Sequence, residues 1–420
     1  MFIIKIVAIM NTEVKGLPKE ISRNNFNAFL WHAAFLAFAQ SFMDVDTIIP
    51  AMIIESGGSA FHVGLMTAIL LGGSSFTQLF FAPWLSNSPY KKKYLLTGIN
   101  ARILSLLALG IILYHLRYHQ SKAFLGIIFL FITIFALGGA FANISYIDIL
   151  GKSINTYRRK SFFSTRQIIN GSVILLSGYL AKQLVSLKEY PLNYSLSFIT
   201  GGTLLLIASL GFWKIKETIG TRLKVSSVRD YIITLKSELK NNKRLIYFLG
   251  YINTQGVALS FLPFVMLYSK QSFNALNSDT GAFLFSKIIG MVAISILVLI
   301  YSGKIRYNLI LYLNVILTLS LVSSVMLVES LDTFRYIFIL GGIVFSLYSI
   351  GMNGVLLEVS GHSNRALYAG FAGAGNILPA IFPLIGGWFI ELFGFHIFCI
   401  VFAVVVSLSL LFIYKMRCSN

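Results

Sequence analysis

Residues 123–149 read AFLGIIFLFITIFALGGAFANISYIDI, an apolar run whose one charged residue, Asp148, stands next to its end. A helix of ~20 apolar residues spans the ~30 Å hydrocarbon core of a bilayer and satisfies its own backbone hydrogen bonds there. A basic segment follows, with Lys152, Arg158, Arg159 and Lys160. The run predicts a membrane-spanning helix that ends at a basic loop.

Eleven further apolar runs of similar length fill the rest of the chain. The predicted spans are 27–54, 61–85, 95–115, 123–149, 162–185, 193–213, 244–268, 279–301, 307–328, 333–357, 366–390 and 394–414. A mean hydropathy of +0.79, with 56% apolar and only 12% charged residues, excludes an ordinary soluble domain. We therefore predict an all-α membrane protein with twelve transmembrane helices.

The loops between the runs alternate between basic and non-basic. One set carries Lys91, Lys92, Lys93, Lys152, Arg158, Arg159, Lys160, Lys304, Arg306, Arg365, Lys415 and Arg417; the other carries Glu55, the mixed pair Lys188 and Glu189, Asp279, Glu329, Asp332 and Glu391. Because basic loops stay in the cytoplasm during insertion, we predict a multi-pass protein of the cell inner membrane with both termini cytoplasmic. Topology and contact with anionic membrane lipids account for the net charge of +19. No motif for binding RNA or DNA interrupts the apolar pattern, so we predict no nucleic-acid partner.

Residues 214–243 form the one long polar stretch inside the chain and are rich in lysine and arginine. Val228, Tyr231, Leu235 and Leu239 recur in this stretch at helical spacing, which predicts a basic amphipathic helix on the inner leaflet. The predicted organisation is a cytoplasmic segment 1–26, a six-helix bundle 27–213, a cytoplasmic linker 214–243, a second six-helix bundle 244–414 and a cytoplasmic tail 415–420.

The two halves repeat a pattern of charges. Asp148 ends the fourth span and precedes Arg158 and Arg159, whereas Glu358 ends the tenth span and precedes Arg365. Internal repeats of this kind build carriers that work by alternating access. The repeat therefore predicts two related bundles around one transport path.

From about residue 25 onward the chain resembles the major facilitator superfamily. The resemblance rests on the six-plus-six layout, the repeated acid and arginine pattern, the Lys91-Lys92-Lys93 turn and the segment Pro383-Leu384-Ile385-Gly386-Gly387. It implies two pseudo-symmetric six-helix bundles, a central substrate cavity lined mainly by spans one, four, seven and ten, and a monomer. The turn departs from the family in having Asn87 or Ser88 where an Asp is usual. The Gly-Pro-Gly-Gly signature of many drug antiporters is missing from span five, which favours a metabolite or nutrient.

Asp44 and Asp46 lie in the outer part of span one. Two residues along a helix are separated by about 200°, so a continuous helix predicts that the two carboxylates face different sides. Asp44 shares its face with Gln40 and Thr47, which makes it the better candidate for a polar cavity. Either residue is a candidate for the coupling proton, with Asp44 favoured. The alternative is a structural carboxylate that pairs with a base or caps the carbonyl freed by Pro50.

Lys287 lies about nine residues into span eight, hence ~13 Å from the outer surface and close to the midplane. A charge at this depth is costly and calls for a specific role. Three roles stay open: a counter-ion for an anionic substrate group, a switchable partner of Asp44, or a permanent ion pair that locks two helices.

Further polar residues in the spans are assigned to a gate or to substrate binding. The candidates for a cytoplasmic gate, which closes by making and breaking ion pairs, are Asp148, Arg158, Arg159, Arg166, Arg102, Glu358 and Arg365. For Arg102, snorkelling to the inner interface is an equal alternative. The substrate-binding candidates are Lys287, Gln40, Asn143, Tyr146, Asn253, Gln255, Asn353 and Asn376. Individually, each of the uncharged ones is more often an interhelical hydrogen bond worth ~0.6 kcal/mol.

Catalytic and cofactor motifs are missing from the sequence. The six histidines are scattered, the two cysteines have no metal-ligand spacing, and no nucleotide-binding loop occurs. We therefore predict no enzyme activity, no metal and no cofactor. The predicted function is secondary active transport of a small solute, with an anionic metabolite or nutrient as the candidate substrate and protons or another ion for coupling. The alternatives are an exporter of drugs or amphipaths, a lipid flippase, and a membrane scaffold or sensor that transports nothing.

Overall fold

The computed structural model describes residues 18–86, 88–115, 122–154, 156–217, 228–301, 305–360, 373 and 375–416. Within these ranges the chain is helical and contains no strand. Ten helices are long and apolar enough to cross a membrane, and shorter apolar helices at Ala60–Gly73 and Leu378–Phe393 occupy the second and eleventh positions. The prediction of an all-α protein with twelve transmembrane helices is confirmed.

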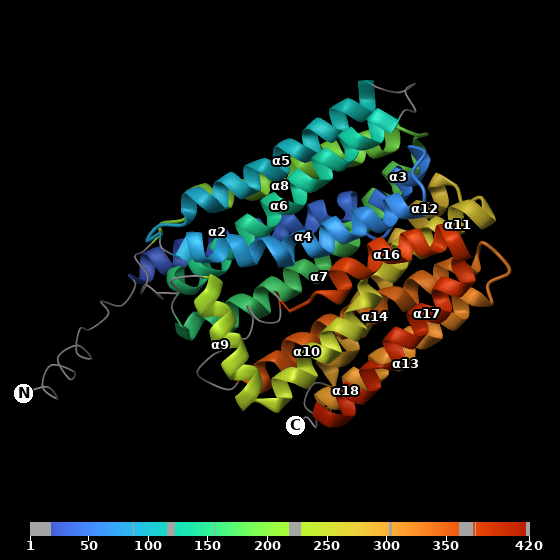
Figure 1. Ribbon diagram of the computed structural model, residues 1–420. Helices are drawn as coiled ribbons and strands as arrows, with labels where there is room; N and C mark the ends of the chain where they lie inside the picture. Colours follow the sequence, from blue (N-terminus) through green and yellow to red (C-terminus); the bar gives the residue numbers. More distant parts are fainter. Residues whose placement is uncertain are drawn as a thin grey trace, which may run out of the picture.

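The helices form two groups that lie side by side (Figure 1). The first group contains α2 (Lys19–Gln40), the 3-10 turn η1 (Ser41–Met43), α3 (Ile48–Glu55), α4 (Ala60–Ser86), α5 (Lys92–His115), α6 (Lys122–Ser153), α7 (Thr156–Leu187) and α8 (Leu192–Lys214). The linker helix α9 (Val228–Asn241) follows. The second group contains α10 (Lys243–Gly256), η2 (Val257–Ser260), α11 (Phe261–Phe273), α12 (Asn277–Ile300), α13 (Tyr307–Met326), α14 (Thr333–Ser360), α16 (Leu378–Phe393), α17 (Phe395–Ser407) and α18 (Ser409–Met416).

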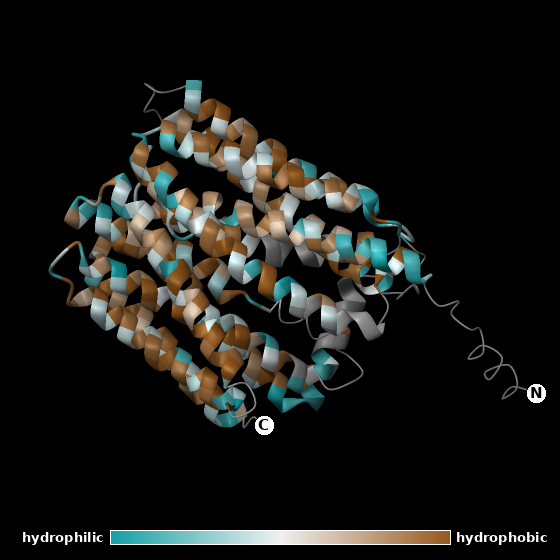
Figure 2. Cartoon of the chain, turned by 180° about the vertical axis from the view of Figure 1, so that it is seen from behind, coloured by the Kyte–Doolittle hydropathy of each residue, from teal (hydrophilic) through white to brown (hydrophobic). Residues whose placement is uncertain are grey.

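The outer surface of both groups is apolar. Figure 2 shows brown, hydrophobic stretches along the lengths of the helices and teal residues gathered toward their ends. Leu299 and Ile300 of α12, for example, are 71% and 66% exposed. Exposed apolar area on this scale is typical of a surface that contacts lipid, so the protein is a multi-pass membrane protein.

The two ends of the helix assembly differ in what they carry. α2 begins, α8 ends, α10 begins and α18 ends on the side where α9 lies (Figure 1). We call this side the terminal end. The opposite side, where α3 ends and α12 begins, is called the distal end.

The two groups meet along α4 with α16 and along α7 with α12. Gly64 of α4 lies against the backbone of Pro383 with no room for a Cβ atom. Gly281 of α12 lies similarly close to the backbone of Lys182 in α7. Small residues at these contacts let the helices of the two groups approach closely.

Span one is interrupted, contrary to the continuous helix that its apolar sequence predicts. After α2, the chain passes through η1 and an extended residue at Asp44, with φ −63° and ψ 129°, before α3 resumes at Ile48. The first span of the second half contains the comparable turn η2 between α10 and α11. Asp44 and Pro50 favour this break, because an aspartate can cap a new helix and proline suits its first turn.

Candidate functional site: charged residues between and within the two bundles

Lys287 pairs with two carboxylates from the other half of the protein. Its Nζ lies 2.6 Å from Oδ2 of Asp44 and 2.5 Å from Oδ2 of Asp46. The Lys287 side chain is only 4% exposed. These three residues, which we call the triad, connect α12 to the break in span one at mid-membrane depth.

The break brings both carboxylates to one side, so the prediction that they face different sides was wrong. Oδ1 of Asp44 accepts hydrogen bonds from the backbone N–H of Asp46 at 3.0 Å and of Thr47 at 2.9 Å. The Thr47 hydroxyl donates to the same oxygen at 2.9 Å. Because Asp44 holds this turn in a non-helical form, the 100° step per residue of a helix no longer applies between positions 44 and 46.

The surroundings of Lys287 distinguish between its predicted roles. Two carboxylates occupy its ammonium, and the Phe345 ring lies 5.8 Å away. An ammonium that is already shared by two carboxylates is a poor counter-ion for a substrate. The predicted contact with Asp44 is present, and Asp46 is an additional partner.

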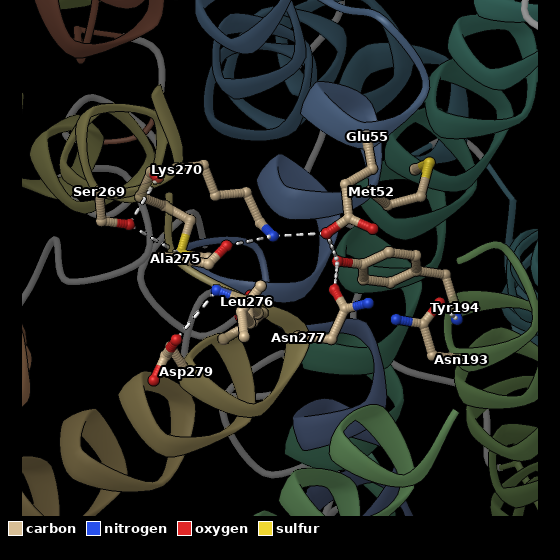
Figure 3. Close-up of polar contacts among 12 residues, drawn as sticks. Met52, Glu55, Asn193, Tyr194, Ser269, Lys270, Ala275, Leu276, Asn277 and Asp279 are labelled. Carbon is tan, nitrogen blue, oxygen red and sulfur yellow. Dashed lines mark hydrogen bonds and ion pairs between the residues drawn. The ribbon is translucent and has the colours of Figure 1, made fainter. Parts of the chain in front are cut away.

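A second cluster joins the halves at the distal end (Figure 3). Nζ of Lys270 in α11 lies 2.5 Å from Oε1 of Glu55 in α3, and the Tyr194 hydroxyl donates to the same Glu55 oxygen at 2.9 Å. The Tyr194 hydroxyl also lies 3.3 Å from the Asn277 side chain. Glu55, Lys270, Tyr194 and Asn277 are called the distal latch below.

Two neighbouring contacts extend the distal latch. Glu391 of α16 accepts the backbone N–H of Phe61 in α4 at 2.9 Å, again across the two halves. Within the first half, the Tyr190 hydroxyl donates to Ser56 at 3.1 Å. Burial raises the pKa of Tyr190, and the nearby Glu55 charge acts in the same direction, so this hydroxyl stays a donor.

The distal latch was not among the sites predicted from the sequence. Glu55 and Lys270 each stand just beyond the predicted end of the first span of their half, at 54 and 268. Opposite charges at equivalent positions of two related halves are the signal that would have identified this pair.

Ion pairs at the terminal end stay within one half. Asp148 pairs with Lys91 at 3.1 Å and Lys152 at 2.9 Å within the first bundle, and Lys152 pairs at 2.7 Å with Glu217, which follows the end of α8 on the first-half side of α9. In the second half, Glu358 pairs with Arg244 at 2.6 Å. Every terminal-end ion pair between two described residues is of this kind.

The predicted gate residues are therefore distributed differently from the expected network. Arg365 and the side chains of Arg158 and Arg159 lie outside the described residues. Neither Arg102 nor Arg166 forms an ion pair with Asp148. Their side chains instead point to aromatic rings inside the first bundle.

Known proteins with similar sequences or folds identify the chain. The model of the Major Facilitator Superfamily matches residues 30–376. The chain belongs to this superfamily. It is therefore a secondary transporter of small solutes and not an enzyme. No curated protein sequence matches the chain.

Solved transporter structures share this fold at low sequence identity. A point mutant of the nucleoside transporter NupG is 12% identical, with a TM-score of 0.66, over 93% of this chain and 98% of that one. The xylose transporter XylE from E. coli in an inward-open conformation is 12% identical, with a TM-score of 0.65, over 94% and 96%. A POT family transporter in complex with a thioalcohol-conjugated peptide is 12% identical, with a TM-score of 0.66, over 94% and 96%. At this identity the likeness shows the fold alone.

Two of the predicted substrate-binding residues hold helices of the transporter together. Gln255 is fully buried and donates from Nε2 to Asn314 at 2.7 Å and to Thr318 at 2.8 Å. Asn253 accepts the backbone N–H groups of Ile377 and Leu378 at the start of α16, at 3.1 and 2.8 Å. These contacts are structural, and they satisfy the polar atoms that a ligand would need.

The other predicted residues remain available to a solute. Gln40, Asn143 and Asn353 are exposed, although each lies within or at the end of a membrane-spanning helix. Oδ1 of Asn376 is buried without a hydrogen-bond partner. Tyr146 faces Arg166, whose Cζ lies 5.9 Å from the tyrosine ring centroid. Polar groups at this depth face a protein interior or a water-filled path rather than lipid.

Proposed function

We propose that the transporter works by alternating access and couples solute movement, as a symporter, to the binding of a proton at the triad. The observation that carries this proposal is the charge count of the triad. Two carboxylates share one ammonium, so the site has one excess negative charge in a poorly solvated place. Binding of a proton to one carboxylate neutralises the site, and a buried site favours neutrality.

Asp46 is the residue that takes the proton in this proposal. Asp44 accepts three hydrogen bonds on Oδ1 besides its contact with Lys287 on Oδ2, so both of its oxygens are already occupied as acceptors. Lys287 is the only polar partner of the Asp46 side chain within the described part of the chain. Protonation of Asp46 therefore removes one of the two ion pairs that join the halves at this depth.

The position of the ion pairs supports one end state of the cycle. The triad, the distal latch and the contact of Glu391 with Phe61 join the halves in the middle and at the distal end. The terminal-end pairs of described residues do not cross between the halves. With the basic loops and both termini in the cytoplasm of the inner membrane, this is the inward-facing state, closed to the outside.

Distances between spin labels on the purified protein in lipid nanodiscs test the proposal. Lys188→Cys with Ser330→Cys reports on the distal end, and Lys93→Cys with Lys415→Cys reports on the terminal end, in a Cys399→Ala, Cys418→Ser background. These four label sites are exposed. We expect the distal distance to lengthen and the terminal distance to shorten when the pH is lowered from about 8 to about 5, because a proton on Asp46 weakens the distal closure.

Two variants serve as the test and its control. Asp46→Asn should hold the low-pH distances at both pH values, because it mimics the protonated carboxyl group. Asp332→Asn alters an exposed distal carboxylate whose ion-pair partner, Arg335, lies three residues further along the chain in the same half, and should leave the response unchanged. Distances that do not change with pH in the unaltered protein would overturn the proposal that a proton at the triad drives the transport cycle. A pH response that persists in Asp46→Asn would move the proton site elsewhere.

A further inference from the structure

Two arginines lie inside the first bundle, and neither has an acidic partner among the residues that the structure describes. Cζ of Arg102 in α5 is 4.3 Å from the ring centroid of Phe135, and Cζ of Arg166 in α7 is 5.9 Å from that of Tyr146. Nε of Arg102 is buried without a hydrogen-bond partner. By contrast, Lys91, Lys152, Arg244, Lys270 and Lys287 each pair with a carboxylate.

His32 of α2 completes this cluster. It is 4% exposed, and its Nε2 is buried without a hydrogen-bond partner. The imidazole stacks on Phe212 with ring centroids 3.9 Å apart and lies 6.0 Å from Tyr146. Arg102 lies against Gly139 of α6, two turns before Tyr146 on the same helix. Four helices thus direct cationic and polar groups into one region that contains no paired acid among the described residues.

The depth of the cluster suits a solute that enters from the terminal end. Arg102 and Arg166 each stand about ten residues from the terminal end of their helix, or about 15 Å along its axis. Tyr146 lies on α6 between Asn143, which is exposed, and the terminal end of that helix. In the inward-facing state proposed above, this region adjoins the open side.

We infer that Arg102, Arg166, His32 and Tyr146 bind an anionic oxygen group, a carboxylate or a phosphate, of the transported solute. This inference rests on the proposed transport function and names the solute class. Guanidinium groups bind such oxyanions through two parallel N–H bonds, and unpaired arginines at membrane depth require a negative partner. Because Lys287 is occupied by two carboxylates, the anion site lies in the first bundle and not at the triad.

The cluster also has a purely structural interpretation, in which Arg102 and Arg166 stabilise the bundle through their aromatic contacts. The two interpretations predict opposite effects on stability without a ligand. An arginine that awaits an anion destabilises the empty protein, so Arg102→Met and Arg166→Met should raise its unfolding temperature. Structural arginines would lower it on removal.

Ligand-dependent thermal unfolding of the purified full-length protein tests the anion site. The probes are sodium succinate and sodium phosphate against sodium chloride of equal ionic strength, with xylitol as a neutral solute. We expect succinate, phosphate or both to stabilise the protein saturably, and xylitol to have no effect. Stabilisation by succinate alone would show that the site binds a carboxylate, and stabilisation by phosphate alone would show that it binds a phosphate. Stabilisation by both would show that the site recognises the oxyanion chemistry that they share.

The variants make the test specific. Arg166→Gln and Arg102→Gln should each weaken binding of the anion at least about tenfold, because each removes a charged hydrogen-bond donor. Arg166→Lys keeps the positive charge and should retain part of the affinity for the anion. This variant therefore shows whether the loss of affinity in Arg166→Gln is due to the loss of charge. Arg335→Gln alters an exposed arginine at the distal end, and this variant should bind the anions as tightly as the unaltered protein does.

Three outcomes would overturn the anion site: no saturable stabilisation by either anion, equal weakening in Arg335→Gln, or lower apo stability in both Met variants with unchanged anion binding. None of them affects the pH-dependent label distances, which depend on the triad. Failure of the anion site is therefore distinguishable from failure of the proposed transport cycle.

Discussion

The ion pairs of the distal half and those of the terminal end differ in which parts of the protein they join. Lys287 and Lys270 each pair with carboxylates from the other bundle. The described pairs of Lys91, Lys152 and Arg244 stay within their own bundle. Pairs within a bundle survive any rigid movement of the bundles, whereas pairs between bundles must break when the distal end opens. The comparison indicates which charges report on the transport cycle and which only shape a bundle.

Removal of Lys287 tests the comparison most severely. In Lys287→Ala two carboxylates at membrane depth lose the cation that they share, which we expect to cost about 3–5 kcal/mol of folding stability. Chemical unfolding in detergent measures the loss. Adding Asp44→Asn and Asp46→Asn to Lys287→Ala should restore most of it, since no buried charge is then left. A triple variant as unstable as the single one would contradict the charge-balance argument.

The two aspartates of the triad should differ in their structural contribution. Asp44→Ala removes both an ion pair and the cap of the turn, whereas Asp46→Ala removes an ion pair only. We expect Asp44→Ala to be less stable than Asp46→Ala by about 1–2 kcal/mol, because the variant also loses the hydrogen bonds that Asp44 accepts from Asp46 and Thr47 in the turn. The same unfolding assay compares them, and equal stabilities would argue against a role of Asp44 in holding the turn.

The ion pair Glu55–Lys270 of the distal latch and the ion pair Arg244–Glu358 at the terminal end can be compared directly. Glu55→Gln should shift the equilibrium between the bundles toward the distal-open state by about 1 kcal/mol, roughly fivefold, as measured by the spin-label distances. Arg244→Gln breaks a pair of similar length within one bundle and should leave those distances unchanged. A shift in Arg244→Gln as large as that in Glu55→Gln would remove the distinction drawn above.

The smallest effect is expected from a distal pair that does not cross between bundles. Arg335 lies 3.6 Å from Asp332 in an exposed i,i+3 arrangement on one helix end. Arg335→Gln should change stability by less than about 0.5 kcal/mol and leave the label distances unchanged. This variant separates location at the distal end from contact between the bundles, and a clear opening in it would show that distal charge alone controls closure.

The fold was predictable from the sequence because the length and the apolar composition of a segment decide whether it crosses the membrane. Ten helices of the described residues are long and apolar enough to cross a bilayer, and two shorter apolar helices take the second and eleventh positions. The repeat of Asp148 and Glu358 at equivalent spans indicated two related halves, and the family match confirms that architecture. The linker helix was also predicted, and α9 covers the expected apolar positions from Val228 to Leu239.

The candidate site was only partly predictable. Lys287 was singled out by its depth, and its contact with Asp44 was one of three roles considered. Asp46 as a second partner was missed because helical periodicity assumes a continuous helix. The aspartate at position 44 with Pro50 near the new helix start was the available signal for a break.

The sequence by itself determined the class of protein, the number of spans and the location of its costly charges. These follow from transfer of each segment into lipid, a local property of some twenty residues. The partners of those charges were decided by the tertiary structure alone: Lys270 with Glu55, Lys287 with both aspartates, and Arg102 and Arg166 with aromatic rings instead of Asp148. Ion pairs act over a few ångströms, and only the packing of helices distant in sequence brings two charges that close.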